Sequence, residues 1–216
     1  GAATYRFEPD RSAAAGLRPG DLPPDWPDDT AAIHVGTLGL VLEPTATTLA
    51  RWAATAPPEV LVMLDPNLRP KAIPDAFAYR RRLAAVLARA DVVKASVEDL
   101  AWLAPAATPM DAARDLLDAG PRAILVTSGP EPVRIVTPGS TVDVPVPDVP
   151  IVDTVGAGDA FGAGFLAAWI GARLGRQDLV DTGALDRAVR RAVDVAAWTV
   201  GRAGADPPRA ADLGRG

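Results

Sequence analysis

The stretch that most constrains this chain is the glycine-rich segment DTVGAGDAF, residues 153–161. Residues 149–152 before it are apolar and predict a short strand. After it, Phe161, Phe165 and Trp169 recur every four residues, which places them on one face of a buried helix. The segment is therefore expected to be a strand-to-helix turn whose backbone can approach a ligand closely.

The amides of this turn predict a binding site for an anion. Gly156 and Gly158 lack a Cβ, so their N–H groups remain open to a ligand at the positive end of the helix dipole. Asp159 follows in the first turn and faces the anion. A carboxylate there suggests work on a neutral group next to a phosphate, such as a hydroxyl about to receive it. The alternative is an ordinary glycine-rich helix start in which Asp159 only stabilises the dipole.

The segment resembles the C-terminal signature of the ribokinase (PfkB) family of carbohydrate kinases, Asp-Thr-x-Gly-Ala-Gly-Asp-x-Phe. Every fixed position of that pattern is present here. The resemblance implies that Gly156, Ala157 and Gly158 hold the transferred phosphoryl group of ATP. It also implies that Asp159 is the base that takes the proton of the sugar hydroxyl.

Hydrophobic patterning along the rest of the chain predicts an α/β fold. Strands alternate with amphipathic helices, which indicates a doubly wound, mostly parallel sheet with helices on both faces. Strands are expected at residues 31–35, 60–64, 91–93, 123–127, 133–136 and 141–146, and helices at 44–56, 74–90, 96–103, 110–119 and 184–200. Residues 31–216 would form the ribokinase-like, nucleotide-binding kinase core. Residues 1–30 would be a linker that includes a strand at 3–8, the remnant of a β lid.

Polar side chains after two of these strands are candidates for the site, because ligands of open α/β sheets bind beyond the carboxyl ends of the strands. Asn67 and Arg69 follow the strand at 60–64 and resemble the family's Asp-x-Asn-x-Arg motif. The resemblance places the arginine near the transferred phosphate or the sugar. The alternative is a rigid turn in which Asp65 caps the next segment.

Ser96 and Asp99 follow the strand at 91–93 and resemble the family's Asn-x-x-Glu motif, which is linked to magnesium and phosphate. Glu98 is an alternative to Asp99 in that role. Ser96 and Asp99 are equally consistent with a plain helix start, since serine followed by an acidic residue is a common N-terminal cap.

Thr127 and Gly129 match part of a Thr-x-Gly-x-x-Gly loop that touches the nucleotide in the family. Pro132 replaces the second glycine, so the loop cannot close over phosphate in the usual way. The segment at 196–205 resembles the region that borders adenine. In several relatives, backbone carbonyls of that region and the equivalents of Asp153 and Val155 bind a monovalent cation. The resemblance therefore implies that Asp153, Val155 and Gly204 are ligands of such a cation.

Composition excludes several other classes of protein. The chain has 216 residues, a formal net charge of −5 and no cysteine. An acidic chain of this kind is not expected to bind nucleic acid, and cysteine chemistry is impossible. No apolar run is long enough to span a membrane, and a cytoplasmic location is expected. The single histidine, His34, is expected to be a packed core residue.

The predicted function is ATP-dependent phosphorylation of a sugar hydroxyl, with Mg²⁺ and, by resemblance, K⁺ as ions. The sequence around residues 36–40 and 65–70 looks most similar to fructokinases, with 2-keto-3-deoxygluconate kinase as the runner-up. A kinase-like binding or regulatory protein without catalysis is the alternative. A homodimer is one expected assembly. The resemblance covers only the later part of a family member, so these residues alone are expected to show at most weak ATPase activity.

Overall fold

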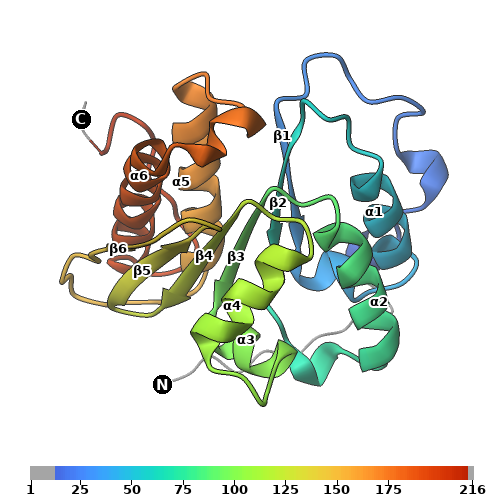
Figure 1. Cartoon of the computed structure of the whole chain (residues 1–216), viewed down its shortest axis with the longest axis horizontal. Coiled ribbons are helices and arrows are strands. Elements are labelled where there is room, and N and C mark those ends of the chain that lie inside the picture. The colour runs from blue at the N-terminus through green and yellow to red at the C-terminus, as the bar shows by residue number, and fades with distance from the viewer. Residues whose placement is uncertain (1–12, 214–216) are drawn as a thin grey trace.

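The computed structural model describes residues 13–213, which form one mixed sheet of six strands in the order β1 to β6 (Figure 1). The first four strands are mutually parallel, and the last two are added as antiparallel hairpins. The strands are β1 (Ala32–Gly36), β2 (Leu61–Asp65), β3 (Val92–Ser96), β4 (Ala123–Ser128), β5 (Glu131–Val136) and β6 (Thr141–Val144).

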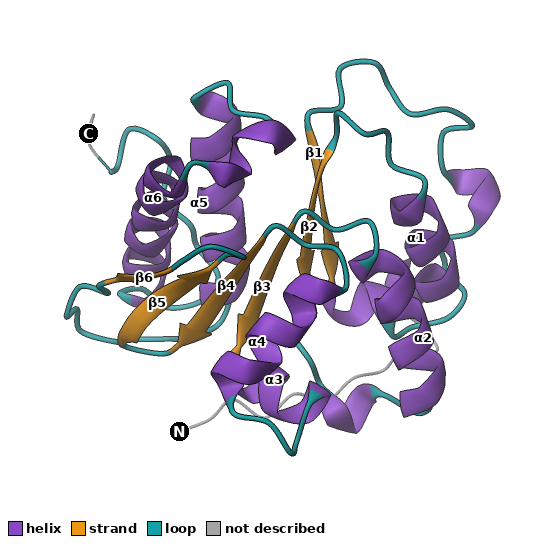
Figure 2. Cartoon of the chain, in the orientation of Figure 1, coloured by secondary structure: helices purple, strands orange, loops and turns teal. Residues whose placement is uncertain are grey.

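Helices cover both faces of the sheet, as the sequence predicts (Figure 2). One face carries α1 (Thr45–Ala54), α2 (Ala76–Leu87), α3 (Val97–Leu103) and α4 (Pro109–Asp118). The other carries α5 (Ala157–Gly171) and α6 (Thr182–Val200), which pack against each other. Short 3₁₀ helices lie at Ala13–Ala15, Pro19–Asp21, Thr37–Leu40, Pro70–Ala72 and Arg176–Val180.

Side-chain alternation along the central strands creates two hydrophobic cores. In β2, Val62 and Leu64 point toward α1 to α4, whereas Leu61 and Met63 point toward α5 and α6. All four are nearly inaccessible to solvent. Successive side chains of a strand point to opposite faces, so a run of apolar residues is required wherever both faces are covered. Because β1 to β4 run parallel, their carboxyl ends all lie at the same end of the sheet.

The strand predicted at residues 149–152 is absent from the described structure. Ile151 and Val152 are each 62% exposed, and the segment is an extended loop. Its backbone is bonded to a helix instead of a strand, since Val152 N donates to Val200 O at the end of α6 (2.8 Å). The prediction was wrong because an apolar run cannot reveal whether a neighbouring strand is available. The lid strand predicted at 3–8 lies outside the described residues.

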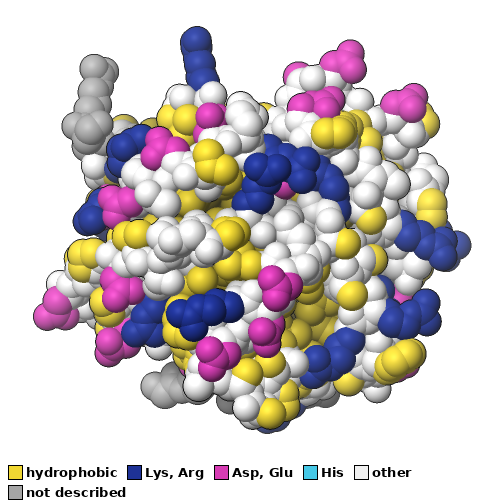
Figure 3. Space-filling view, viewed as in Figure 1, with side chains coloured by type: hydrophobic (Ala, Val, Ile, Leu, Met, Phe, Trp, Pro, Cys, Tyr) yellow, Lys and Arg dark blue, Asp and Glu magenta, His cyan; other side chains and the backbone are white. Residues whose placement is uncertain are grey.

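On the face shown in Figure 3, acidic and basic side chains lie in small, interspersed groups. This distribution agrees with the modest formal charge of −5. Among residues 13–213, no helix combines the length and apolar character needed to cross a bilayer.

Candidate functional site

The start of α5 has the geometry of an anion-binding turn. Gly156 is the N-cap residue and has a left-handed backbone (φ 79°). A Cβ there would lie 2.6 Å from the Cβ of Ala205, so only glycine fits without rearrangement. Ala160 N donates the first intrahelical bond, to Gly156 O (2.8 Å). The amides that precede it have no acceptor within the helix, as at any helix start, although Ala157 N donates a long bond to Thr154 O (3.3 Å) in the turn before it. Asp159 lies in this first turn and is exposed.

Asp153 joins this turn to the segment that follows α6. Its Oδ1 accepts from Val155 N (3.0 Å), and its Oδ2 accepts from Gly204 N (2.9 Å). These two backbone bonds lower the pKa of Asp153 below its ordinary value of 3.8, because they favour the charged carboxylate. The structure thus brings together Asp153, Val155 and Gly204, the three residues that resemblance assigns to a monovalent cation.

We expect acid to release this connection. A carboxyl group whose pKa is lowered by folding stabilises the native contact above its unfolded pKa and loses that contribution as the pH falls through the folded pKa. The amide signals of Val155 and Gly204 should therefore titrate together, with a midpoint below 3.8. NMR titration measures this directly, and the Asp153→Asn variant should show no such transition. A midpoint at or above the ordinary value would contradict the assignment.

The loop after β2 is folded onto itself and onto the end of β1. Arg69 Nη1 donates to Asn67 Oδ1 (2.7 Å), and Asn67 Nδ2 donates to Thr37 Oγ1 (3.3 Å). The two strands approach closely here: a Cβ on Gly36 would lie 1.7 Å from Asp65 O. Asn67 and Arg69 are both partly exposed and directly follow the carboxyl end of β2.

The loop after β3 carries a structural cap. Ser96 Oγ accepts from Asp99 N (3.1 Å), while Asp99 Oδ2 accepts from Ser96 N (2.9 Å), a reciprocal capping box. Asp99 Oδ1 accepts from Leu68 N (2.7 Å) and so ties this helix to the preceding loop. Asp99 is 5% exposed, whereas Glu98 is exposed. The helix-start interpretation of this pair is therefore confirmed, and any contact with nucleotide or metal stays a prediction.

The loop after β4 is a tight hairpin turn at Gly129 and Pro130. Gly129 has a left-handed backbone (φ 54°), and the antiparallel ladder shifts register between Val126 and Ser128. Pro132 lies opposite that irregularity, where a missing N–H costs little. Thr127 is placed beside Ser96 in the parallel register of β3 and β4. No hydrogen bond or ion pair within residues 13–213 joins Thr127 or Gly129 to α5.

A buried ion pair under α5 was not predicted. Lys94 Nζ donates to Asp65 Oδ2 (3.0 Å), with side-chain exposures of 6% and 2%. Burial raises the pKa of Asp65, and the Lys94 charge opposes that rise. Asp65 therefore pairs across the sheet; the residue that caps the next helix, α2, is Asp75. The sequence signal that could have indicated this ion pair is Lys94 itself, a lysine within an otherwise apolar strand.

His34 is exposed, so the prediction that it is a packed core residue was wrong. It lies on β1, an edge strand of the described sheet, on the side that faces Gly162 of α5. Partial desolvation lowers the pKa of His34, while the carboxylates of Asp65 and Asp159 act in the opposite direction. The sequence could not predict this exposure, because a single histidine among apolar residues does not indicate that its strand lies at the edge of a sheet.

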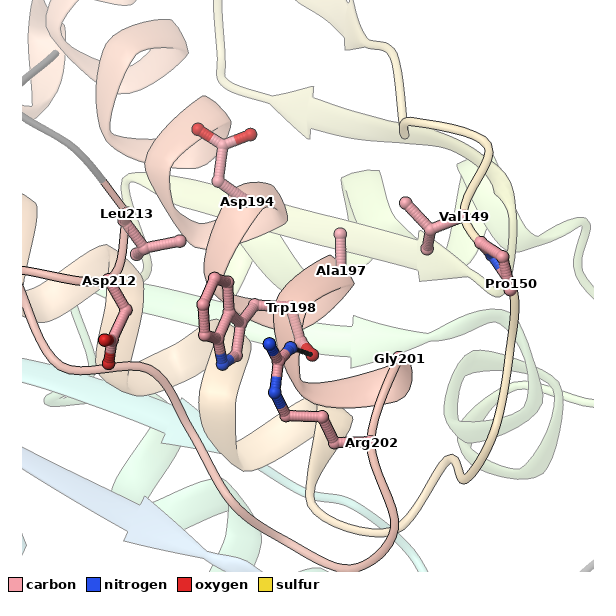
Figure 4. A pocket seen from close by; sticks show the side chains of 9 residues that line it. All are labelled: Val149, Pro150, Asp194, Ala197, Trp198, Gly201, Arg202, Asp212 and Leu213. Atoms are coloured by element: carbon pink, nitrogen blue, oxygen red, sulfur yellow. Dashed lines mark hydrogen bonds between the residues drawn. The ribbon is translucent and has the colours of Figure 1, made fainter.

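A pocket of about 490 Å³ lies beside the C-terminal end of α6 (Figure 4). Val149 and Pro150 form one wall, and Trp198 and Arg202 lie across from them. The Arg202 guanidinium stacks on the Trp198 ring at 3.6 Å and donates to Trp198 O (3.0 Å). The pocket therefore belongs to the segment at 196–205 that resemblance places beside adenine.

Comparison with known proteins identifies the class. Residues 5–211 match the pfkB family of carbohydrate kinases, and the chain belongs to that family. A fructokinase from Rhizobium leguminosarum bv. trifolii is 36% identical over 168 residues, which cover 78% of this chain and 51% of the relative. The chain thus spans about half the length of this relative.

Solved structures share the fold. Aminoimidazole riboside kinase from Salmonella enterica has a TM-score of 0.81 at 27% identity, covering 97% of this chain and 68% of the other. The fructokinase from Vibrio cholerae O395, solved in its fructose, ADP and calcium bound form, has a TM-score of 0.76 at 25% identity, with 88% and 60% coverage. These similarities confirm the ribokinase-like fold expected from the sequence.

Proposed function

We propose that this protein transfers a phosphoryl group from ATP to a sugar hydroxyl. The observation that carries the proposal is the start of α5: a complete family signature, amides without an acceptor in the helix, and an exposed Asp159. The exposure of Asp159 favours catalysis over a purely structural role at the helix start.

The residues of the α5 turn and Arg69 each have a proposed role in the reaction. The amides of Gly156, Ala157 and Gly158 bind oxygens of the transferred group at the positive end of the helix. Asp159 accepts the proton of the sugar hydroxyl as the hydroxyl oxygen bonds to the γ-phosphorus of ATP and the bond from that phosphorus to ADP breaks. Arg69 offsets charge that develops on the phosphoryl oxygens. Because phosphoryl transfer is largely dissociative, positioning and charge neutralisation provide most of the acceleration.

The ions expected for such a site fit the residues present. Mg²⁺ keeps several waters and binds through nucleotide phosphates with one or two carboxylates, and Glu98 is exposed at the start of α3. When bound, Mg²⁺ neutralises charge on the phosphates. For K⁺, Asp153 would supply the carboxylate oxygens; here these accept from Val155 N and Gly204 N, and any backbone ligands would have to be carbonyl oxygens.

The nucleotide is proposed to extend from the α5 turn toward α6. Its adenine would enter the pocket between Pro150 and Trp198, which lies on the segment that links α6 to that turn. The Arg202 guanidinium covers one face of the Trp198 ring, so the base would stack on the other face. Thr127, Gly129, Ser96 and Asp99 complete the proposed nucleotide contacts at the neighbouring strand ends.

Fructose is the proposed acceptor, because the Rhizobium relative at 36% identity is a fructokinase. The test is ADP release from ATP across a panel that contains fructose, 2-keto-3-deoxygluconate and aminoimidazole riboside. The assay needs the complete gene product, since the described chain spans about half of that relative. Fructose-dependent ADP release is the expected result. Release with none of these acceptors would overturn the proposal.

A further inference from the structure

Lys94 is an unusual residue in this chain. The sequence contains 20 arginines and only two lysines, Lys71 and Lys94. Lys94 lies within β3, where Val92, Val93 and Ala95 are all completely buried. Replacing a buried ion pair by apolar residues is often neutral or stabilising, so stability alone gives little reason to keep one. The ammonium therefore requires another explanation.

The position of Lys94 links it to the anion-binding turn. Its Nζ lies 2.9 Å from the point that a Cβ on Gly158 would occupy. Since Gly158 is in the first turn of α5, the ammonium lies against the turn proposed to hold the phosphoryl group. Glycine at this position thus keeps the backbone open and also leaves room for the Lys94 head group.

The hydrogen bonds of the pair are incomplete within the described residues. An ammonium has three N–H donors, and Lys94 Nζ uses one of them, toward Asp65 Oδ2. The other carboxylate oxygen, Asp65 Oδ1, is buried without a hydrogen-bond partner. Buried polar groups are usually satisfied, so unused donors and acceptors beside an anion-binding turn point to a group that completes them.

We propose that Lys94 is part of the phosphate-binding site, where its ammonium, oriented by Asp65, offsets the negative charge of nucleotide phosphates held at the start of α5. This inference rests on the proposed kinase function and extends it to a residue outside the signature. A fixed positive charge in a site that excludes water stabilises developing anionic charge more strongly than it would in water. It acts on the phosphates and not on the adenosine part of the nucleotide.

The scarcity of lysine makes a direct test possible. In this 216-residue chain labelled with ¹⁵N-lysine, the two side-chain signals are those of Lys71 and Lys94. ADP should shift the Lys94 signal and leave that of Lys71 almost unchanged, whereas adenosine should shift neither. If ADP binds with no change at Lys94, the inference is overturned. If the wild-type complete gene product binds no ADP, the proposed function itself fails, and this result separates the two claims.

Variants test whether the charge acts through phosphate. Lys94→Met alone leaves the Asp65 charge buried and unpaired, which can prevent folding. The double variant Lys94→Met/Asp65→Leu removes both charges and keeps the site apolar. We expect ADP affinity to fall about tenfold or more in the folded double variant, with adenosine affinity unchanged within about twofold. Unchanged ADP affinity, or an equal loss for adenosine, would refute the role.

A matched control removes a charge far from the turn. Arg122 is an exposed cation immediately before β4, at the opposite edge of the sheet from the start of α5. Arg122→Met should leave both affinities unchanged. If it weakens ADP binding as much as the double variant, the effect of Lys94 is one of overall charge and the proposal is wrong.

Discussion

Asp159→Asn should reduce turnover of the active enzyme by about 10² or more, the usual scale for loss of a general base. The side chain is exposed at the start of α5, so the substitution removes a proton acceptor without opening a cavity. Nucleotide affinity and thermal stability should change little. Steady-state kinetics and calorimetric titration with ADP measure the two effects separately.

A matched carboxylate separates chemistry from charge. Asp118→Asn removes one negative charge at the end of α4, on the opposite face of the sheet, where the side chain is also exposed. Its turnover should stay near that of the wild type. Near wild-type turnover in Asp159→Asn would mean that Asp159 is not the base.

Gly158→Val should abolish or severely weaken the binding of nucleotide phosphates. Any Cβ at this position would lie 2.9 Å from Lys94 Nζ, and a branched side chain would also cover the amides of the turn. Loss of one charge-assisted hydrogen bond, about 1.5–3 kcal/mol, corresponds to about a 10- to 100-fold lower affinity for ADP.

The same substitution at the other end of α5 is the control. A Cβ on Gly171 would have nothing within 4 Å, so Gly171→Val should bind ADP as the wild type does. Calorimetry on both variants, with circular dichroism to confirm folding, distinguishes a local effect from a general effect of valine in this helix. Equal ADP affinity in Gly158→Val and the wild type would remove the turn from the site.

Most of the fold is predictable from the sequence because its elements depend on local patterns. Strands β2 and β4 are continuous apolar runs, and the helices between them carry amphipathic spacing with clear caps, such as Ser96 in α3. The α5 turn is equally predictable, since a long signature with two glycines leaves few other conformations for the backbone.

What the sequence could not predict depends on contacts between distant segments. Residues 149–152 are apolar but bond to the end of α6 in place of a strand. Lys94 and Asp65 are 29 positions apart and meet only because β2 and β3 are neighbours. The exposure of His34 follows from the position of β1 at the edge of the described sheet. Each of these features requires the strand order, which no local pattern contains.

The most direct test of this account is an amide NMR titration of the complete gene product with a non-hydrolysable ATP analogue and Mg²⁺, compared with adenosine. The largest shifts specific to the analogue are expected at Gly156, Ala157 and Gly158, whose amides have no acceptor within α5. Shifts confined to other strand ends, with these three amides unchanged, would contradict it.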